Sequence, residues 1–328
     1  MEVKTVQDTL KAGGCGERHK YTTAKIGVLM GGPSSEREIS LKSGRAVFES
    51  LKKQRLDVVA VDIPSDDPAE TKEILRRNGI ECAVIALHGK FGEDGTVQAV
   101  LDELGIPYSG SGVRASSQAM DKTAAKKLFV AGGLACPRHF VLEKTTPAGQ
   151  AIACDFDLPW VVKPVSGGSS IGLSLVEHRD DLTRALEEGF AYDDRLIIEE
   201  YIRGRELTVA ILGKKPLSVI EIVPKTRFFD YRAKYEKGMT EYIVPARLDP
   251  EIEQDVKAAA LRAHTLLGCS GASRVDIMLS ENDTAYVLEV NTIPGLTATS
   301  LLPKAAGHEG IDFDHLCLKL LESAYEKE

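Results

Sequence analysis

Residues 273–291 read SRVDIMLSENDTAYVLEVN, and this stretch decides how the C-terminal part of the chain is predicted to fold. Two apolar, β-favouring runs, 273–279 and 285–290, flank the polar sequence Ser280-Glu281-Asn282-Asp283, which is typical of a turn. Side chains alternate between the two faces of a strand, so residues two apart share a face. The stretch therefore predicts a β-hairpin.

The polar residues of this hairpin suggest a metal site. Alternation places Arg274 beside Asp276 on one strand and Glu289 beside Asn291 on the other. Oxygen ligands of this kind suit Mg²⁺, a hard cation that keeps waters and bridges phosphates. An arginine on the same surface would neutralise negative charge that develops in a transition state. The alternative at this point is a pair of surface strands with one polar face.

The composition excludes several classes of protein. The 328 residues, 43% hydrophobic and 27% charged, are typical of a globular chain of two or three domains. A net charge of −8 and a pI near 5.5 argue against a nucleic-acid or membrane surface, and no run reaches the ~18 apolar residues of a membrane span. The polar residues 1–24 lack the apolar core of a secretory signal and are interpreted as an N-terminal extension. Six cysteines without metal-binding spacing favour a reducing, cytoplasmic location.

Residues 25–112 are predicted to form a parallel α/β domain. Strands and helices alternate along it, with strands at 25–30, 57–61 and 82–87 and helices at 38–53, 68–77 and 95–104. Ligands of such sheets bind where the carboxyl ends of the strands meet. In this chain those ends are residues 31–36 and 88–94.

The sequence Ser109-Gly110-Ser111-Gly112 predicts a domain boundary, and two further domains are predicted at 113–203 and 204–328. The first of these contains predicted helices at 121–131 and 180–189 and strands that end at residues 164 and 201. The second is rich in strands from residue 206 onward. It also contains predicted helices at 250–268 and 313–322.

Two segments of the middle domain are candidates for binding a nucleotide. Lys163-Pro164 leads into the Gly/Ser loop 166–172, whose backbone N–H groups and hydroxyls would approach a phosphate. An ordinary hairpin loop is the alternative. The apolar strand 196–202, followed by Glu206, would hold an adenine through its backbone and a ribose through a carboxylate. A sheet strand with polar ends is the alternative there.

Three further features point to a substrate site. Glu36, at a predicted helix start, would attract an ammonium group, while Ser35 and Glu38 have the spacing of an N-terminal capping box. His88 follows a strand and has either a structural or a catalytic role. Lys234 and Tyr235 lie in a long polar and aromatic segment that is interpreted as a lid over a site.

Together and in this order, the motifs resemble the ATP-grasp enzymes and, more narrowly, the D-alanine–D-alanine ligase family, from residue 25 to the C-terminus. The motifs are Gly31-Gly32-x-Ser-x-Glu36-Arg37-Glu38-Ile39-Ser40, Leu87-His88-Gly89 with Gly92-Glu93-Asp94-Gly95, Met120-Asp121-Lys122, the Lys163-Pro164 loop, Ala233-Lys234-Tyr235, Arg274-Val275-Asp276, and Glu289-Val290-Asn291-Thr292-x-Pro294-Gly295. The resemblance implies an α/β (α+β ATP-grasp) fold in which a parallel α/β domain precedes two subdomains that hold ATP between them.

The resemblance also implies the residues that bind the nucleotide and the metal. ATP is expected to contact Lys122, Lys163, Ser169, Ser170, Glu199, Glu200, Tyr201, Ile202 and Glu206. Asp276, Glu289 and Asn291 are expected to hold two Mg²⁺ ions, with Mn²⁺ as an alternative metal. Glu200 is a departure, because some family members carry lysine at that position.

The implied activity is the ATP-dependent joining of two D-alanine molecules through an acyl phosphate, for the synthesis of peptidoglycan precursors. The expected substrate-binding residues are Glu36, His88, Lys234, Arg274, Ser300 and Leu301, and the expected catalytic residues are Glu36, Ser169, Tyr235, Arg274, Gly295 and Ser300. Glu36 would pair with the ammonium group of the first D-alanine, and Ser300 with the Leu301 N–H would receive the carboxylate of the second. Arg274 and the Gly295 N–H would hold the oxyanion, and Glu36, Ser169 and Tyr235 would form a link that closes the lid.

Lys234-Tyr235 favours D-alanine as the second substrate over D-lactate, and a homodimer is implied by the family. The alternatives are another ATP-grasp carboxylate–amine ligase (the D-lactate or D-serine type being nearest), a nucleotide-binding module without catalysis, and a Rossmann dehydrogenase. The non-catalytic module predicts the loss of a metal ligand or of Arg274, and neither is lost. The dehydrogenase lacks its glycine fingerprint.

Overall fold

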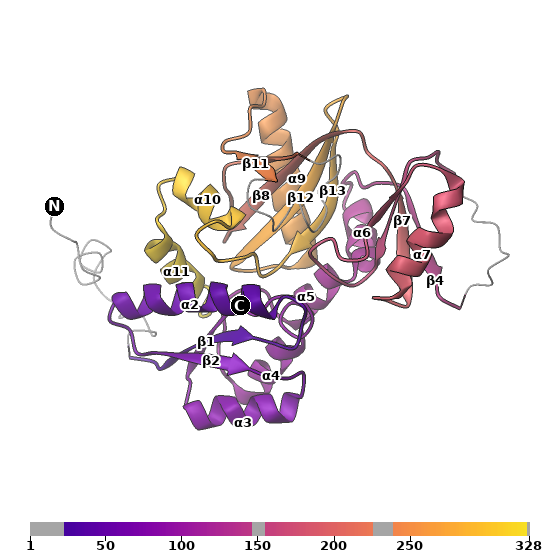
Figure 1. The fold of residues 1–328 in the computed structure, drawn as a ribbon. Coiled ribbons are helices and arrows are strands. Elements are labelled where there is room, and N and C mark those ends of the chain that lie inside the picture. The colour runs from indigo at the N-terminus through magenta and orange to yellow at the C-terminus, as the bar shows by residue number, and fades with distance from the viewer. Residues whose placement is uncertain (1–22, 146–154, 226–238, 327–328) are drawn as a thin grey trace. The chain divides into compact units, whose positions relative to one another are not determined.

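The structure, a computed structural model, describes residues 23–145, 155–225 and 239–326. The predicted lid residues Lys234 and Tyr235 therefore lie outside the described residues. The chain divides into two compact units (Figure 1). Unit 1 is Met1–Gly110 together with Ile293–Glu328, and unit 2 is Ser111–Thr292. The predicted division into three domains, with boundaries after residues 112 and 203, stays a prediction.

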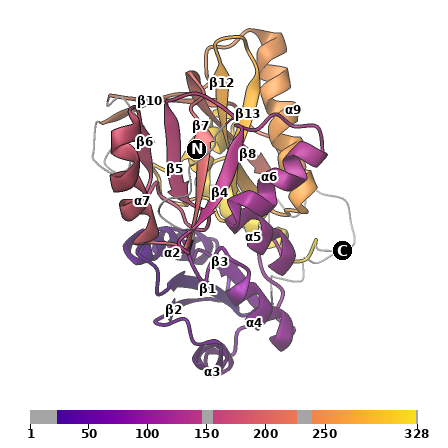
Figure 2. The same cartoon turned by 90° about the vertical axis from the view of Figure 1, so that its right-hand side faces the viewer.

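Unit 1 contains a parallel three-stranded sheet, as predicted. Its strands are β1 (Ile26–Gly31), β2 (Val58–Ile63) and β3 (Cys82–Ile85), in the order β2-β1-β3. All residues of the central strand β1 and of β3 are buried, because helices cover both faces of a parallel sheet and its strands become continuous apolar runs. Helix α2 (Arg37–Lys53) connects β1 to β2, α3 (Pro68–Asn78) connects β2 to β3, and α4 (Thr96–Leu104) follows β3. Figure 2 shows α3 and α4 beside this sheet.

The C-terminal part of the chain returns to unit 1 through α10 (Leu301–His308) and α11 (Phe313–Glu322). Helix α11 packs against α2. Asp314 of α11 accepts a hydrogen bond from Ser50 at 2.8 Å and pairs with Lys53 at 2.6 Å. These contacts tie the last helix to the first helix that the structure describes.

Unit 2 contains two antiparallel sheets. The smaller has the order β4-β7-β5-β6, from β4 (His139–Glu143), β7 (Arg195–Glu200), β5 (Trp160–Pro164) and β6 (Ser174–Val176). Helix α7 (Leu182–Phe190) packs on this sheet. Trp160 is buried in an apolar cluster to which residues of the sheet and of α7 contribute. The predicted Gly/Ser loop connects β5 to β6, as a hairpin loop does.

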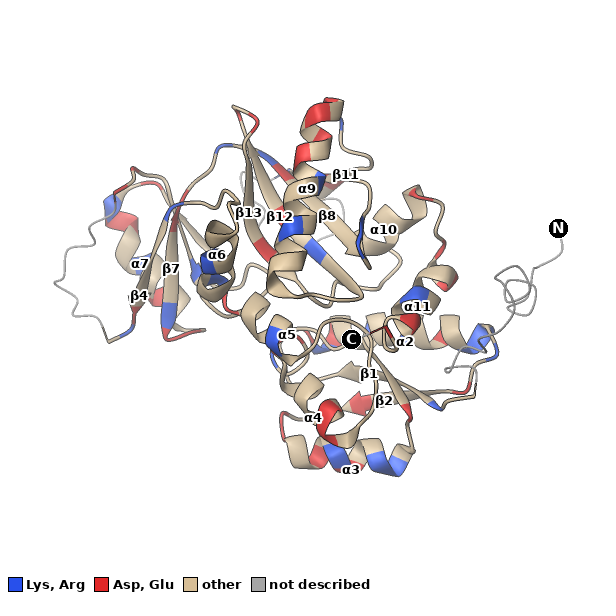
Figure 3. Cartoon of the chain, turned by 180° about the vertical axis from the view of Figure 1, so that it is seen from behind, with Lys and Arg blue, Asp and Glu red and all other residues tan. Residues whose placement is uncertain are grey.

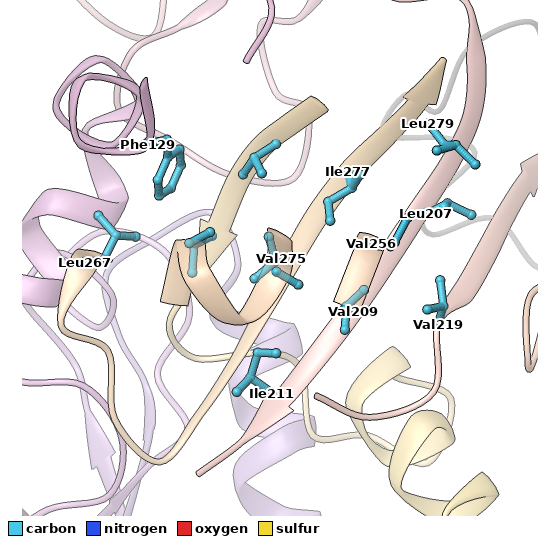
Figure 4. Packing of buried hydrophobic residues seen from close by; sticks show 14 of the residues in the cluster. Phe129, Leu207, Val209, Ile211, Val219, Val256, Leu267, Val275, Ile277 and Leu279 are labelled. Atoms are coloured by element: carbon cyan, nitrogen blue, oxygen red, sulfur yellow. The ribbon is translucent and has the colours of Figure 1, made fainter. Parts of the chain in front are cut away.

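The larger sheet has the order β11-β10-β8-β12-β13, with the two-residue β9 (Lys215–Pro216) beside β8. Its strands are β11 (Thr240–Ile243), β10 (Ile220–Pro224), β8 (Gly204–Leu212), β12 (Ala272–Ser280) and β13 (Ala285–Asn291). Helices α6 (Lys122–Ala131) and α9 (Pro250–Leu267) pack on one face, where Phe129 and Leu267 join Val275 and Ile277 in the core (Figure 4). The opposite face of β12 carries Arg274, Asp276 and Met278.

Several elements were not predicted. They include α5 (Val113–Met120), β4, β6, β11 and α10. Helix α5 is short, and α10 contains Pro303 and Gly307, residues that argue against a helix in a sequence. Pro303 is tolerated because it lies in the first turn, where backbone N–H groups have no partner within the helix.

Charged residues of both signs occur in both units. In the ribbon of Figure 3, acidic and basic positions are interspersed along the helices of both units. Of the described helices, none combines the length and the apolar character needed to cross a bilayer. The four described cysteines, Cys82, Cys136, Cys269 and Cys317, form no disulfide.

Candidate active site

The predicted hairpin is formed by β12 and β13, and its polar residues pair directly across the two strands. Arg274 lies opposite Asn291, and Asp276 lies opposite Glu289. Both oxygens of Asp276 accept hydrogen bonds from the Arg274 guanidinium, at 2.9 Å from Nε and 2.8 Å from Nη2. Thr208 of the neighbouring strand β8 donates to the same carboxylate at 2.7 Å. Asp276 is thereby held in one orientation.

A β-bulge places the second carboxylate. After the Asp276–Glu289 pair the register shifts, so that Ile277 pairs with Val287 and Leu288 is an extra residue on β13. Strict alternation would put Val287 and Glu289 on the same face. Because of the bulge, Val287 and Val290 both lie in the core while Leu288 and Glu289 both line a pocket.

The donor set of this hairpin fits Mg²⁺. Asp276 and Glu289 supply two carboxylates whose side chains are 12% and 27% exposed, and Asn291 supplies an amide. No cluster of three or more His, Cys, Asp or Glu that suits a metal exists within residues 23–145, 155–225 and 239–326. A cation held here would therefore complete its shell with waters and phosphate oxygens, which is how Mg²⁺ is usually bound.

The two predicted phosphate lysines lie in the same pocket. Lys122 begins α6 and its Nζ is 3.4 Å from Glu289 Oε2, while Lys163 lies on β5 and its Nζ is 3.0 Å from Glu199 Oε2. Burial, only partly offset by Glu289, lowers the pKa of Lys122. Burial opposes the charged form of Lys163 as well, but Glu199 and Glu289 outweigh it and raise the pKa of Lys163.

Glu199 is shared with a third lysine that the sequence did not predict. Lys126 is fully buried, and its Nζ faces Glu199 Oε1 at 2.9 Å as an ion pair, off the line of a hydrogen bond. Burial alone would raise the pKa of Glu199, but Lys126 and Lys163 outweigh it and lower the pKa to about 2. Lys126 lies one helical turn after Lys122, inside the helix predicted at 121–131, and the sequence analysis gave it no role.

The pocket lies within unit 2 and is open to solvent at its mouth. Among its lining residues are the predicted nucleotide contacts Lys122, Lys163, Ser170, Glu199, Glu200, Tyr201, Ile202 and Glu206 together with Asp276 and Glu289. Ser169 is not among the described lining residues, although it neighbours Ser170 in the loop. Val161, Met278 and Leu288 add an apolar wall that the sequence analysis missed. A pocket with apolar walls and a polar end suits a base with attached phosphates.

The Gly/Ser loop has an unusual backbone and is anchored at its base. Ser169 and Ser170 both adopt positive φ, 55° and 56°, a conformation that non-glycine residues rarely adopt and that often marks functional loops. Lys122 Nζ donates to Gly167 O at 2.6 Å, and Ser166 forms a β-bridge with Asp121. The start of α6 and the loop are therefore held together.

The carboxylate of Glu200 is bound by Arg138. Its two oxygens accept from the backbone N–H of Arg138 at 2.9 Å and from Arg138 Nε at 2.8 Å. The side chain thus pairs with the residue that precedes β4, the neighbouring strand, while Glu200 still lines the pocket. Its position at the end of β7 is consistent with a backbone contact to a base.

Unit 1 brings Glu36 and His88 into one cluster. Glu36 is the N-cap of α2, so the predicted capping box of Ser35 and Glu38 is wrong. Instead, the Ser34 hydroxyl donates to His88 O at 2.6 Å and accepts from the Glu36 N–H at 3.2 Å. This link ties the start of α2 to the end of the neighbouring strand.

The ring of His88 is enclosed by polar groups of unit 1. Its Nε2 lies 2.9 Å from Ser43 Oγ, and its Nδ1 lies 3.4 Å from Glu93 Oε1. Burial raises the pKa of Glu93, a shift that the hydrogen bond with His88 opposes. The Leu296 N–H donates to Ser43 Oγ at 3.3 Å. His88 therefore connects Glu93 to the segment that follows Thr292.

The remaining predicted substrate residues lie at the start of α10. Ser300 is the N-cap of this helix and Leu301 is its first residue, so the Leu301 N–H is one of the free donors of a helix start, where carboxylates bind favourably. Ser300 Oγ accepts from the Thr297 N–H at 3.1 Å. A Cβ at Gly295 would lie 2.8 Å from Ser300 Oγ, which explains the glycine.

Two family models match most of this chain. The family model "D-ala D-ala ligase C-terminus" matches residues 128–322, and the model "D-ala D-ala ligase N-terminus" matches residues 25–73 and 65–111. A D-alanine–D-alanine ligase from Geotalea uraniireducens (strain Rf4) is 47% identical over 302 residues, which cover 92% of this chain and 96% of that protein. The chain belongs to the D-alanine–D-alanine ligase family. The family and the activity predicted from the sequence, the ATP-dependent formation of D-alanyl-D-alanine, are confirmed.

Solved structures of ligases share the fold. D-alanine–D-alanine ligase from Bacillus anthracis, complexed with ATP, has a TM-score of 0.79 at 35% identity and covers 93% of this chain and 98% of its own. VanG D-Ala:D-Ser ligase from Enterococcus faecalis also has a TM-score of 0.79, at 31% identity, covering 92% of this chain and 99% of its own. The predicted α/β ATP-grasp fold class is confirmed.

Proposed function

We propose that this member of the D-alanine–D-alanine ligase family makes its dipeptide in two steps. The carboxylate of the first D-alanine attacks the γ-phosphate of ATP, which gives an acyl phosphate and ADP. The amine of the second D-alanine then attacks the acyl carbonyl, and phosphate leaves from the tetrahedral intermediate. Both reactants of the first step are anions, so fixed cations are needed before they meet.

Unit 2 is assigned to the nucleotide. Lys122 and Lys163 would bind the phosphates, and the residues of the Gly/Ser loop 166–172 would cover them. The backbone at the end of β7 would bind the adenine against the apolar wall, and Glu206 would bind the ribose. The observation that carries this assignment is that two buried lysines and two paired carboxylates line one pocket.

Asp276, Glu289 and Asn291 would hold the metal, for which we propose Mg²⁺. When bound, the ion neutralises phosphate charge and orients the transferred group. Arg274, whose guanidinium would receive the oxyanion, is hydrogen-bonded to Asp276. A proposed metal ligand therefore also positions Arg274. The predicted contribution of the Gly295 N–H to the same oxyanion stays a prediction.

Unit 1 is assigned to groups of the amino acid substrates. Glu36, beside Gly89 and Ser34, would pair with the ammonium group of the first D-alanine. Ser300 and the Leu301 N–H, at the start of α10, would receive the carboxylate of the second. His88 would support this site through its contacts with Ser43 and Glu93.

The test is the release of phosphate from Mg-ATP by the purified chain with and without D-alanine. We expect release that depends on D-alanine and equals the amount of dipeptide formed. Release at the same rate without D-alanine would mean that the site is an ATPase, and the proposed roles would be wrong. The same measurement without Mg²⁺ tests the metal assignment separately from the nucleotide assignment.

A second candidate, suggested by the similarity to a D-Ala:D-Ser ligase, is a preference for another second substrate. Lys234-Tyr235 in the sequence favours D-alanine. Competition between D-alanine, D-serine and D-lactate at neutral pH, with products separated by mass, decides the point. A homodimer and a cytoplasmic location stay predictions, which size-exclusion chromatography and cell fractionation would check.

A further inference from the structure

The buried lysine Lys126 has no part in the roles proposed above. It is fully buried on α6, four residues after Lys122. Its Nζ faces Glu199 Oε1 at 2.9 Å, while the other oxygen of Glu199 faces Lys163 Nζ at 3.0 Å. Lys126 lies behind Glu199 and is not one of the described residues that line the pocket.

Burying an ammonium group is costly, and a single carboxylate would already neutralise Lys163. Around Glu199 there are instead two cations, Lys126 and Lys163, and one anion, which sum to +1. The neighbouring pair of Lys122 and Glu289 carries one charge of each sign and leaves this sum unchanged. Without Lys126, Glu199 and Lys163 would form a closed pair with a net charge of zero. Of the two lysines, only Lys163 lines the pocket, so the surplus positive charge is presented there.

We infer that Lys126 is a positioning residue for nucleotide binding: it shares the carboxylate of Glu199 and so leaves Lys163 with positive charge for a nucleotide phosphate. This inference rests on the proposed role of Lys163. Lys126 touches neither nucleotide nor metal in this scheme and acts through Glu199 alone. The low pKa of Glu199, about 2, supports a carboxylate that stays ionised between its two lysines.

The charge argument distinguishes ligands with phosphates from those without. Lys126→Met removes the charge and keeps most of the side-chain volume. The ammonium charge of Lys126 attracts the phosphates across several ångströms of partly buried space. Without this attraction ADP should bind roughly tenfold more weakly. Adenosine, which has no phosphate, should bind within about twofold of the unmutated chain.

The experiment measures the affinities of ADP and adenosine for the full-length chain by displacement of a fluorescent nucleotide, in magnesium buffer. The conservative variant Lys126→Arg keeps the charge and should keep the ADP-to-adenosine ratio, even if its stability falls. Lys127→Met is the matched control, because Lys127 is the next residue of the same helix and is exposed. If Lys126→Met does not fold, Lys126→Gln replaces it, with the same expected ratio.

Two outcomes would overturn the inference. Equal weakening of ADP and adenosine would show that Lys126 only supports the shape of the pocket, and an unchanged ADP affinity would show that its charge is not felt there. Failure of the proposed function looks different, because the unmutated chain would then bind ADP no more tightly than adenosine. The unmutated chain therefore tests the proposed nucleotide site, and the variants test the role of Lys126.

Discussion

Replacing Glu199 with glutamine should destabilise unit 2 by about 3 kcal/mol, because the substitution leaves two buried lysines without their shared counter-ion. The side chains of Lys126 and Lys163 are 0% and 10% exposed, so water cannot take over the role of the carboxylate. Glutamine keeps the size and one carbonyl oxygen of the side chain. The change is therefore one of charge rather than of packing.

The magnitude follows from the pKa of Glu199. Its ordinary value is 4.5 and its value in the structure is about 2. That difference, at about 1.36 kcal/mol per pH unit, corresponds to about 3 kcal/mol of stabilisation by the charged form. Because the folded-state pKa is lowered, this stabilisation is fully present above pH ~4.5 and is lost as the pH falls toward ~2. The glutamine variant should lack this part of the acid dependence.

The assay is urea unfolding followed by tryptophan fluorescence. Trp160 is the single tryptophan of the sequence and lies buried in unit 2, on the same strand as Lys163, so its emission reports the right unit. Glu187→Gln is the matched control, since Glu187 is exposed on α7 of the same unit, and it should change the free energy of unfolding by less than ~0.5 kcal/mol. A loss below ~1 kcal/mol in Glu199→Gln at neutral pH would refute the reasoning, because the lysines would then not depend on this carboxylate.

Three further predictions concern activity. Glu289→Gln should lower kcat by at least about a hundredfold, because a metal ligand loses its charge, while Trp160 emission stays unchanged; activity like that of the unmutated chain would mean that the metal site is misplaced. Chelation of divalent ions should abolish phosphate release and added Mg²⁺ or Mn²⁺ should restore it, and release that survives chelation would contradict the metal assignment. Gly89→Ala should raise KM for D-alanine, because its Cβ would lie 2.9 Å from Glu36 Oε2, whereas Gly105→Ala, also at positive φ but with open space around it, should leave KM unchanged.

The predictions from sequence succeeded where the signal is local. The helices at 313–322 and 250–268 were placed to within a residue, because apolar spacing and flanking residues define them. The capping box at Ser35 and Glu38 was wrong because Glu36 is the N-cap of α2 and the helix has no side-chain cap. The neighbouring Ser34 hydroxyl bonds to His88, a residue far away in the chain. Helix α10 was missed because its proline is acceptable only in a first turn, which the sequence alone did not locate.

Some features of the candidate site were also predicted from the sequence, and others were not. The identities and order of Lys122, Lys163, Asp276 and Glu289 were enough to predict a nucleotide and metal site. The apolar wall was not predicted, because Leu288 turns toward the pocket only through the bulge beside Glu289. A bulge shifts the alternation of a strand by one residue, and no residue type marks it reliably.

The sequence by itself determined the family, the hairpin and the chemical groups of the site, because strand alternation and motif order depend on neighbouring residues. Only the tertiary structure decided which of those groups form ion pairs with one another. Lys126, Glu199 and Lys163 come from α6, β7 and β5, and they meet because the sheet and the helix bring these elements together. Electrostatic coupling depends on distance and burial in space, and neither can be read from separation along the chain.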